Sequence, residues 1–152
     1  MKRFLTVLTL VVLLPSASDS VASPSKSLDI ILVRIAGSDD FDNSWLIQVA
    51  DVDGAVRGMG GIGIFDGSDV SVVIDSGKVD PDSGDVGLLG FVDASNGVIP
   101  IGANVLVSAS PTGNSTIAFV WFTEGISDAG GPMKIRHGLS FTGTGSVRII
   151  AP

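Results

Sequence analysis

Short runs in which apolar and polar residues alternate recur along the chain, and they constrain the fold more than any other feature. Residues at i and i+2 of a strand face the same side, so a strand with one buried face produces this pattern. A helical bundle would instead repeat its apolar residues every three or four positions. The clearest alternating runs are 69–75, 104–110 and 146–149.

Other runs are apolar at nearly every position, namely 28–36, 86–92 and 117–122. Such runs are typical of central strands that are covered on both faces. Turn dipeptides suited to positive φ separate the runs, at Asp53-Gly54, Asp66-Gly67 and Asn96-Gly97. The sequence therefore predicts a mainly β domain of about eight to ten short antiparallel strands, arranged as a β-sandwich or a jelly roll.

Two structures fit the segment 39–50. Ser38 is a candidate N-cap, and Phe41, Trp45 and Val49 follow at near-helical spacing, which predicts a short helix. The same residues also allow a strand from Trp45 to Asp51, with Trp45 and Val49 on one face. The sequence does not decide between them.

The stretch RGMGGIG at 57–63 contains G-x-G-x-x-G, the spacing of a dinucleotide-binding loop. That site needs a helix within the motif, because the N–H groups of the helix N-terminus hold the phosphates. Here a turn at Asp66-Gly67 and an alternating run follow at once, so no helix has room to form. We expect 58–63 to be a bulge, a bend or a close strand contact, and valine at Gly60 or Gly61 to destabilise the fold.

The first 22 residues have the three-part plan of a secretory signal peptide: a basic start, an apolar run of about half the length that crosses a bilayer, and a small-residue cleavage site. We expect a short extension at 23–27 and one β-rich domain at 28–152. The later apolar runs have strand length, so no transmembrane segment is expected in the mature chain. The protein is expected to be secreted, to an extracellular or periplasmic location.

The chain of 152 residues carries 16 acidic and 9 basic residues, a formal net charge of −7, and has no cysteine. This charge disfavours nucleic acid as a partner, because phosphate binding needs a basic surface. Without cysteine, no disulfide framework supports the fold, so the apolar core must do so alone.

Aspartate-rich loops are the main candidates for a binding role. Calcium takes about six to eight oxygen ligands, commonly from closely spaced aspartates, although none of these loops has the EF-hand spacing. Solvated turn aspartates are the alternative interpretation. Trp45, which lies among polar residues, is a candidate platform for a sugar ring. The candidate calcium ligands are Asp40, Asp42, Asp51, Asp53, Asp80, Asp82 and Asp85.

Few residues suit catalysis. The only histidine, His137, shares strand parity with Met133 and Ile135, which indicates a packed residue. The sequence favours an exported, non-enzymatic protein with a structural, adhesive or surface-interaction role. The alternatives are a carbohydrate-binding module, with or without calcium, and a small hydrolase that pairs Glu124 with an aspartate. A polysaccharide or cell-surface partner and self-association through edge strands are the expected interactions.

Overall fold

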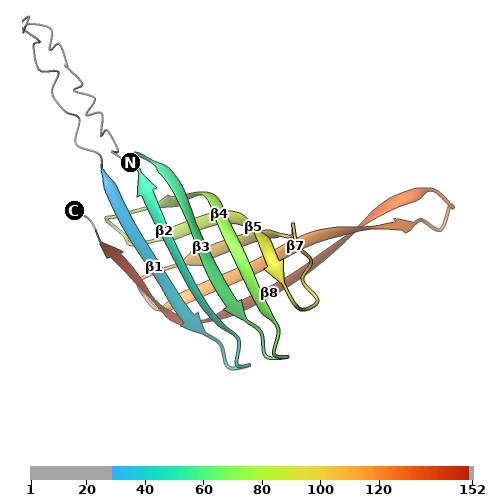
Figure 1. Ribbon diagram of the computed structural model, residues 1–152, viewed down its shortest axis with the longest axis horizontal. Coiled ribbons are helices and arrows are strands. Elements are labelled where there is room, and N and C mark those ends of the chain that lie inside the picture. The colour runs from blue at the N-terminus through green and yellow to red at the C-terminus, as the bar shows by residue number, and fades with distance from the viewer. Residues whose placement is uncertain (1–28, 151–152) are drawn as a thin grey trace, which may run out of the picture.

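The computed structural model describes residues 29–150, which form one closed antiparallel barrel of eight strands (Figure 1). Each strand pairs with the next in sequence, and β8 pairs with β1 to close the ring. The strands are β1 (Ile30–Ser38), β2 (Ser44–Val52), β3 (Ala55–Gly63), β4 (Asp69–Val79), β5 (Val86–Ser95), β6 (Asn104–Ala109), β7 (Asn114–Ile126) and β8 (Pro132–Ile150).

The prediction of a sandwich or jelly roll is wrong, although the mainly β, antiparallel character is confirmed. Closure depends on the pairing of β1 with β8, which runs from Leu32 opposite Ile150 to Ser38 opposite Thr144. Local alternation specifies where a strand lies and which face it buries. It carries no information on whether the two outermost strands meet, so the sequence pattern could not separate a barrel from a sandwich. The expected signal peptide and extension lie outside the described residues.

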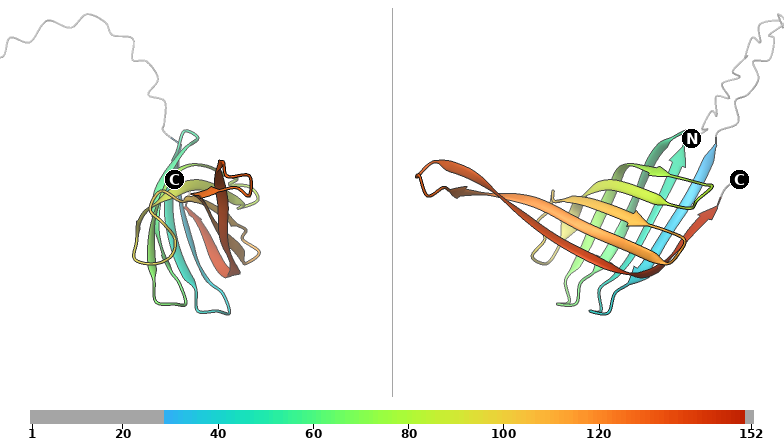
Figure 2. Two further views of the ribbon diagram at one scale, coloured as in Figure 1. Left: turned by 90° about the vertical axis from the view of Figure 1, so that its right-hand side faces the viewer. Right: turned by 180° about the vertical axis from the view of Figure 1, so that it is seen from behind.

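The barrel is strongly sheared. Thr144 of β8 pairs both with Ser38, the last residue of β1, and with Asn114, the first residue of β7. Strands in a closed barrel tilt against its axis when their register is staggered in this way. Seen from behind, β5 to β8 cross obliquely over β1 to β4 (Figure 2).

Side chains fill the barrel interior. An eight-stranded barrel is just wide enough for inward-facing side chains to occupy its whole interior. The interior side chain of Phe119 is fully buried and meets Phe141 edge to face, with 6.3 Å between ring centroids. Aliphatic side chains with no exposed surface surround this pair, including Ile35, Ile47, Val72, Ile74, Val92, Val105 and Ile117.

The segment 39–50 forms a loop and the strand β2, and residues 29–150 contain no helix. The predicted helix is therefore wrong, and the alternative strand is confirmed. Trp45, Ile47 and Val49 all face the interior, as a period of two requires. The indole Nε1–H of Trp45 donates a hydrogen bond to Ser115 Oγ at 3.0 Å. Ser115 thus provides a buried hydrogen-bond partner for the indole N–H, which allows the Trp45 side chain to lie inside the barrel as part of a strand.

The runs that are apolar on both faces do form strands, but nothing covers their outer face within the described residues. Leu32 of β1 is 48% exposed and Leu89 of β5 is 50% exposed. The prediction that these strands are covered on both faces is therefore wrong. A single barrel wall has only one buried side, so the extra apolar residues lie on the outer surface.

A two-stranded ribbon extends beyond the barrel. The pairing of β7 with β6 ends at Val120, whereas β7 and β8 continue to pair as far as Ile126 and Pro132. From Trp121 to His137 the two strands therefore pair only with each other, and we call this segment the ribbon. It projects far past the other strands (Figure 1).

The glycine-rich segment lies within β3, where its members alternate between two environments. An added Cβ at Gly60 would lie 2.6 Å from Ile47 Cγ1 and 2.9 Å from the carbonyl oxygen of Leu46. Gly58 meets the backbone of β2 in a similar way, whereas a Cβ at Gly61 would meet nothing within 4 Å. The predicted close strand contact is confirmed at Gly58 and Gly60, and the expectation for Gly61 changes.

We therefore expect Gly60→Val and Gly61→Val to have different effects. Gly60→Val must displace Ile47 and part of the β2 backbone, which should cost about 1–3 kcal/mol, the usual range for overpacking. Gly61→Val adds an exposed β-branched residue to a strand and should leave stability within about 0.5 kcal/mol of wild type. Urea denaturation of both variants measures the difference, and equal loss in the two would contradict the interpretation.

Candidate binding site at one end of the barrel

Connections between consecutive strands alternate between the two ends of the barrel, because neighbouring strands are antiparallel. The loops 39–43, 64–68 and 96–103 therefore share one end. The turns 53–54, 80–85 and 110–113 share the other. We call the first the phenylalanine end, because Phe41 and Phe65 lie there, and the second the opposite end.

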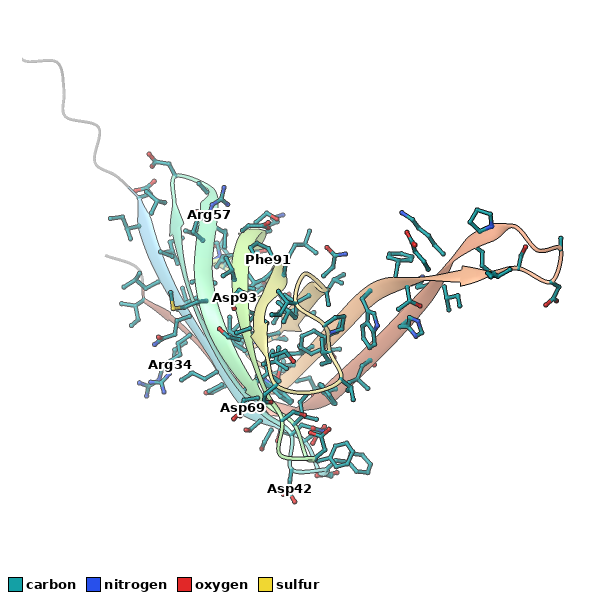
Figure 3. The ribbon with its side chains drawn as sticks, turned by 45° about the vertical axis from the view of Figure 1, so that its right-hand side comes forward. Arg34, Asp42, Arg57, Asp69, Phe91 and Asp93 are labelled. Carbon is teal, nitrogen blue, oxygen red and sulfur yellow. The ribbon has the colours of Figure 1, made fainter. Side chains whose placement is uncertain are left out.

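This arrangement divides the predicted calcium ligands. Asp40 and Asp42 lie in the loop 39–43 at the phenylalanine end, and Asp42 is at its tip (Figure 3). The remaining five, Asp51, Asp53, Asp80, Asp82 and Asp85, lie at or next to turns of the opposite end. Within residues 29–150, no three Asp, Glu, His or Cys side chains come together in a group that could hold a metal ion.

Two of these aspartates, Asp51 and Asp80, accept hydrogen bonds within their own turns. Asp51 Oδ1 accepts from the N–H of Gly54 at 2.8 Å, and Asp80 Oδ1 accepts from the N–H groups of Asp82 and Ser83. The Ser83 and Asp82 N–H groups lower the pKa of Asp80 below its ordinary value, since they stabilise the ionised form. Each aspartate thus stabilises a turn, which is the usual role of this residue in tight connections.

Trp45 is buried, and the candidate catalytic residues His137 and Glu124 lie on the ribbon. Trp45 is 3% exposed, so its ring presents no face to solvent. His137 lies on the ribbon, stacked on Trp121 with 5.5 Å between centroids, and its Nε2 is 2.8 Å from Thr123 Oγ1. Glu124 also lies on the ribbon, opposite Lys134 in the register. Glu124 lines none of the five depressions described below.

Two exposed phenylalanines flank a pocket at the phenylalanine end. Phe41 is 74% exposed and Phe65 is 69% exposed, although each belongs to a short connection between strands. The pocket between them has a volume of about 310 Å³. Its other lining residues are Asp39, Asn43, Ser140, Phe141 and Thr142.

Asn43 joins the two loops that carry the phenylalanines. Its side chain is almost completely buried, with 2% exposed. Oδ1 accepts a hydrogen bond from the N–H of Phe65 at 3.0 Å, and Nδ2 donates one to Asp39 Oδ2 at 2.7 Å. Asp39 Oδ1 in turn accepts from the N–H of Phe41 at 2.9 Å. The backbone positions of Phe41 and Phe65 are therefore coupled through one buried amide.

Hydrogen bonds lower the pKa values of Asp39 and Asp66 at this end. Partial desolvation raises the pKa of Asp39, but hydrogen bonds from Asn43 and from the N–H of Phe41 outweigh it, so the pKa lies below 3.8. Hydrogen bonds from the hydroxyl and the N–H of Ser68 likewise lower the pKa of Asp66. The stability from these bonds is present above pH 3.8 and is lost as the pH falls through the lowered pKa.

The two largest depressions on the outer wall exceed this pocket in volume but are less suited to a specific ligand. One, of about 530 Å³, lies over β4 to β7 and has Leu89 and Leu106 in its apolar floor. The other, of about 550 Å³, lies beside Gly61 and Gly63, where side chains are missing. A specific site usually combines apolar surface with a few converging polar groups. The phenylalanine end has this combination together with a tied backbone.

No protein-family model, curated protein or solved structure matches the chain. In the part of the chain that the structure describes, no helix has the length and apolar character needed to span a membrane. The function must therefore be inferred from the geometry of the sites themselves.

Sequence reasoning missed Phe65 and Asn43, and used Phe41 only as evidence for a helix. A usable signal was present, because both phenylalanines interrupt polar turn sequences, DDFDN and IFDG. Turns favour Gly, Asn, Asp, Ser and Pro for their backbone geometry, so an aromatic residue there has no local structural reason. The role of Asn43 could not be read in the same way, because its partner Phe65 is 22 residues away.

Asn43→Ala should destabilise the protein by about 1–3 kcal/mol, because a buried amide is removed and the part-buried N–H of Phe65 and the carboxylate of Asp39 lose their partner. Asn104→Ala is a matched control, since Asn104 is an exposed residue of β6, and should change stability by less than about 0.5 kcal/mol. Thermal and urea unfolding of both variants tests this. A stability of Asn43→Ala equal to that of Asn104→Ala would show that the amide does not hold the loops.

Proposed function

We propose that this chain is an exported, non-enzymatic binding module that takes a ring of a neutral polysaccharide at the phenylalanine end. The exposed rings of Phe41 and Phe65, presented on two tied loops beside a pocket of about 310 Å³, carry the proposal. Barrel mouths are a common position for ligand sites, and the filled interior leaves the mouth itself as the place for a ligand.

The exposure of both phenylalanines favours a ring as the ligand. Leaving a large apolar side chain in water forfeits about 1.5–3 kcal/mol that its burial would provide. A flat ligand ring that stacks on an aromatic face recovers part of this energy, and aromatic pairs favour offset or edge-on contact. Because Asn43 holds both loops before a ligand arrives, binding orders few additional groups.

The polar groups around the pocket favour a neutral ligand with hydroxyl groups. Ser140 and Thr142 line the pocket, and a hydroxyl can both donate and accept a hydrogen bond. Asp39, Asp40, Asp42 and Asp66 give this end a negative charge. An anionic polymer would be repelled, whereas sugar hydroxyls can donate to the carboxylates.

Phe41→Ser and Phe65→Ser should each weaken binding of a neutral oligosaccharide by roughly twofold to tenfold, the effect of losing one aromatic contact. Phe122→Ser removes a phenylalanine that is 55% exposed on the ribbon and should leave binding unchanged. Titration calorimetry with oligosaccharides of glucose, xylose, mannose or N-acetylglucosamine measures the affinities.

All three variants should melt close to wild type, because the substituted side chains are exposed. Two results would overturn the proposal. One is wild-type protein that binds none of these oligosaccharides, and the other is an equal loss of affinity in Phe122→Ser.

A second candidate role is self-association through the ribbon. β7 beyond Val120 and β8 before Thr144 have a free edge within the described residues. Ile126, at the end of β7, is 79% exposed. An isolated two-stranded hairpin is marginally stable in water, so pairing with a second ribbon would stabilise this segment.

A shortened ribbon tests this role. Phe122 and Arg136 are directly opposite, so replacing 123–135 by Asn-Gly gives a two-residue hairpin turn that fits the register. Wild type should associate as concentration rises, and the shortened protein should stay monomeric with a similar melting temperature. Light scattering over a concentration series measures the association state of both proteins. A wild type that stays monomeric throughout the series would refute the role.

A further inference from the structure

Two arginines lie side by side on the outer wall of the barrel. Arg34 of β1 is directly opposite Arg148 of β8 in the register, with Gln48 of β2 on its other side. Both arginines are exposed. Figure 3 shows Arg34 projecting away from the barrel, far from Asp42 at the phenylalanine end.

Among residues 29–150, no acidic side chain occupies an outward position beside this pair. Directly opposite residues of an antiparallel pair have Cβ atoms about 4.5–5.5 Å apart, and like charges at this spacing destabilise a sheet. The outward positions of β1, β2 and β3, and of 146–150 in β8, hold no aspartate or glutamate. This wall also carries Arg57, although the whole chain has a net charge of −7. An unfavourable basic pair thus lies on a stretch of the described wall that has no outward-facing acid.

Two depressions in the wall meet at the arginine pair. One, of about 300 Å³, is bordered by Leu32 and Ile150 as well as both arginines. The other, of about 340 Å³, is lined by the arginines with Ala36 and Ser146. Both arginines therefore line each depression.

We propose that Arg34 and Arg148 together bind an oxyanion, namely a carboxylate, sulfate or phosphate group of a ligand. The guanidinium group is planar, always charged, and presents a fork of N–H donors that matches such oxygens. A bound oxyanion offsets the repulsion between the two arginines. The bound protein is therefore stabilised relative to the free protein. Gln48 and Ser146 add neutral hydrogen-bonding groups beside the pair.

This oxyanion site is independent of the phenylalanine end and has the opposite charge preference. The phenylalanine end carries aspartates and repels anions, so an anionic group is directed to the wall. The proposed sugar-binding role can fail without affecting the oxyanion site, because the two share no residue.

The test is a nuclear magnetic resonance titration of the full folded protein with sodium acetate, sulfate and phosphate in turn, at constant ionic strength set with chloride. Constant ionic strength separates a specific site from general screening. At least one oxyanion should give saturable shifts of the Arg34 and Arg148 side-chain signals. The three salts distinguish carboxylate, sulfate and phosphate as the preferred group.

Arg34→Gln and Arg148→Gln should each weaken the affinity by about tenfold or more, the value of one charge-assisted hydrogen bond. Each should also leave the melting temperature of the free protein unchanged or raised, because the repulsion is relieved. Arg57→Gln is the control with the same charge change. In the wild-type protein the Arg57 guanidinium donates to the carbonyl of Val56. The affinity of the Arg57→Gln variant for the oxyanion should match that of wild type.

Three results would overturn the proposal. The first is the absence of saturable shifts with all three salts. The second is a loss of affinity in Arg57→Gln as large as that in Arg148→Gln, which would indicate a general charge effect. The third is wild-type affinity in both Arg34→Gln and Arg148→Gln.

Discussion

The pairing of β8 with β1 is the interaction on which the rest of the structure depends. It requires β8 to leave β7 and lie across the end of β1 at Thr144. The glycines on either side of Thr144 make this close approach possible. A Cβ at Gly143 would meet the carbonyl oxygen of Ser38, and a Cβ at Gly145 would meet the carbonyl oxygen of Ala36. Without this seam the sheet would keep two open edges, and its apolar inner face would be exposed to water.

Closure also determines where a ligand can bind. The interior of the barrel is filled by its own side chains, so the available sites are the ends and the outer wall. These surfaces differ in charge. Aspartates gather in the end connections, where their carboxylates accept backbone hydrogen bonds, whereas Arg34 and Arg148 lie on the wall. One small domain therefore offers an acidic surface with exposed aromatic rings and a separate basic surface.

The positions of many strands can be predicted from the local sequence, whereas the closure of the sheet into a barrel cannot. The alternation of Val70, Val72 and Ile74 correctly predicts that all three are buried on one face of β4. Asp53 and Gly54 both have positive φ, as their turn chemistry predicts. A short window of sequence contains these effects completely. Closure of the barrel depends on contacts between the first and last strands, more than 100 residues apart in sequence.

The candidate sites illustrate the same division. Exposed phenylalanines in polar turns are visible in the sequence, whereas the hydrogen bond of Asn43 to Phe65 arises only once β2 and β3 pair. Likewise, Arg34 and Arg148 are unremarkable as separate residues and become a pair only through the seam. The segment 39–50 shows a further limit of prediction from sequence, because the spacing of Phe41, Trp45 and Val49 fits both a helix and a strand. Tertiary pairing selects the strand, and local propensity could not.

The continuity of β8 has a mechanical consequence. A single strand runs from the tip of the ribbon through Thr144 into the seam with β1. A pull on the ribbon along the strand direction is transmitted to this ladder, whose hydrogen bonds lie across the strands. The bonds of the seam then share the load in shear instead of breaking one after another. The projecting ribbon is thus continuous with a ladder whose hydrogen bonds lie across the direction of such a force.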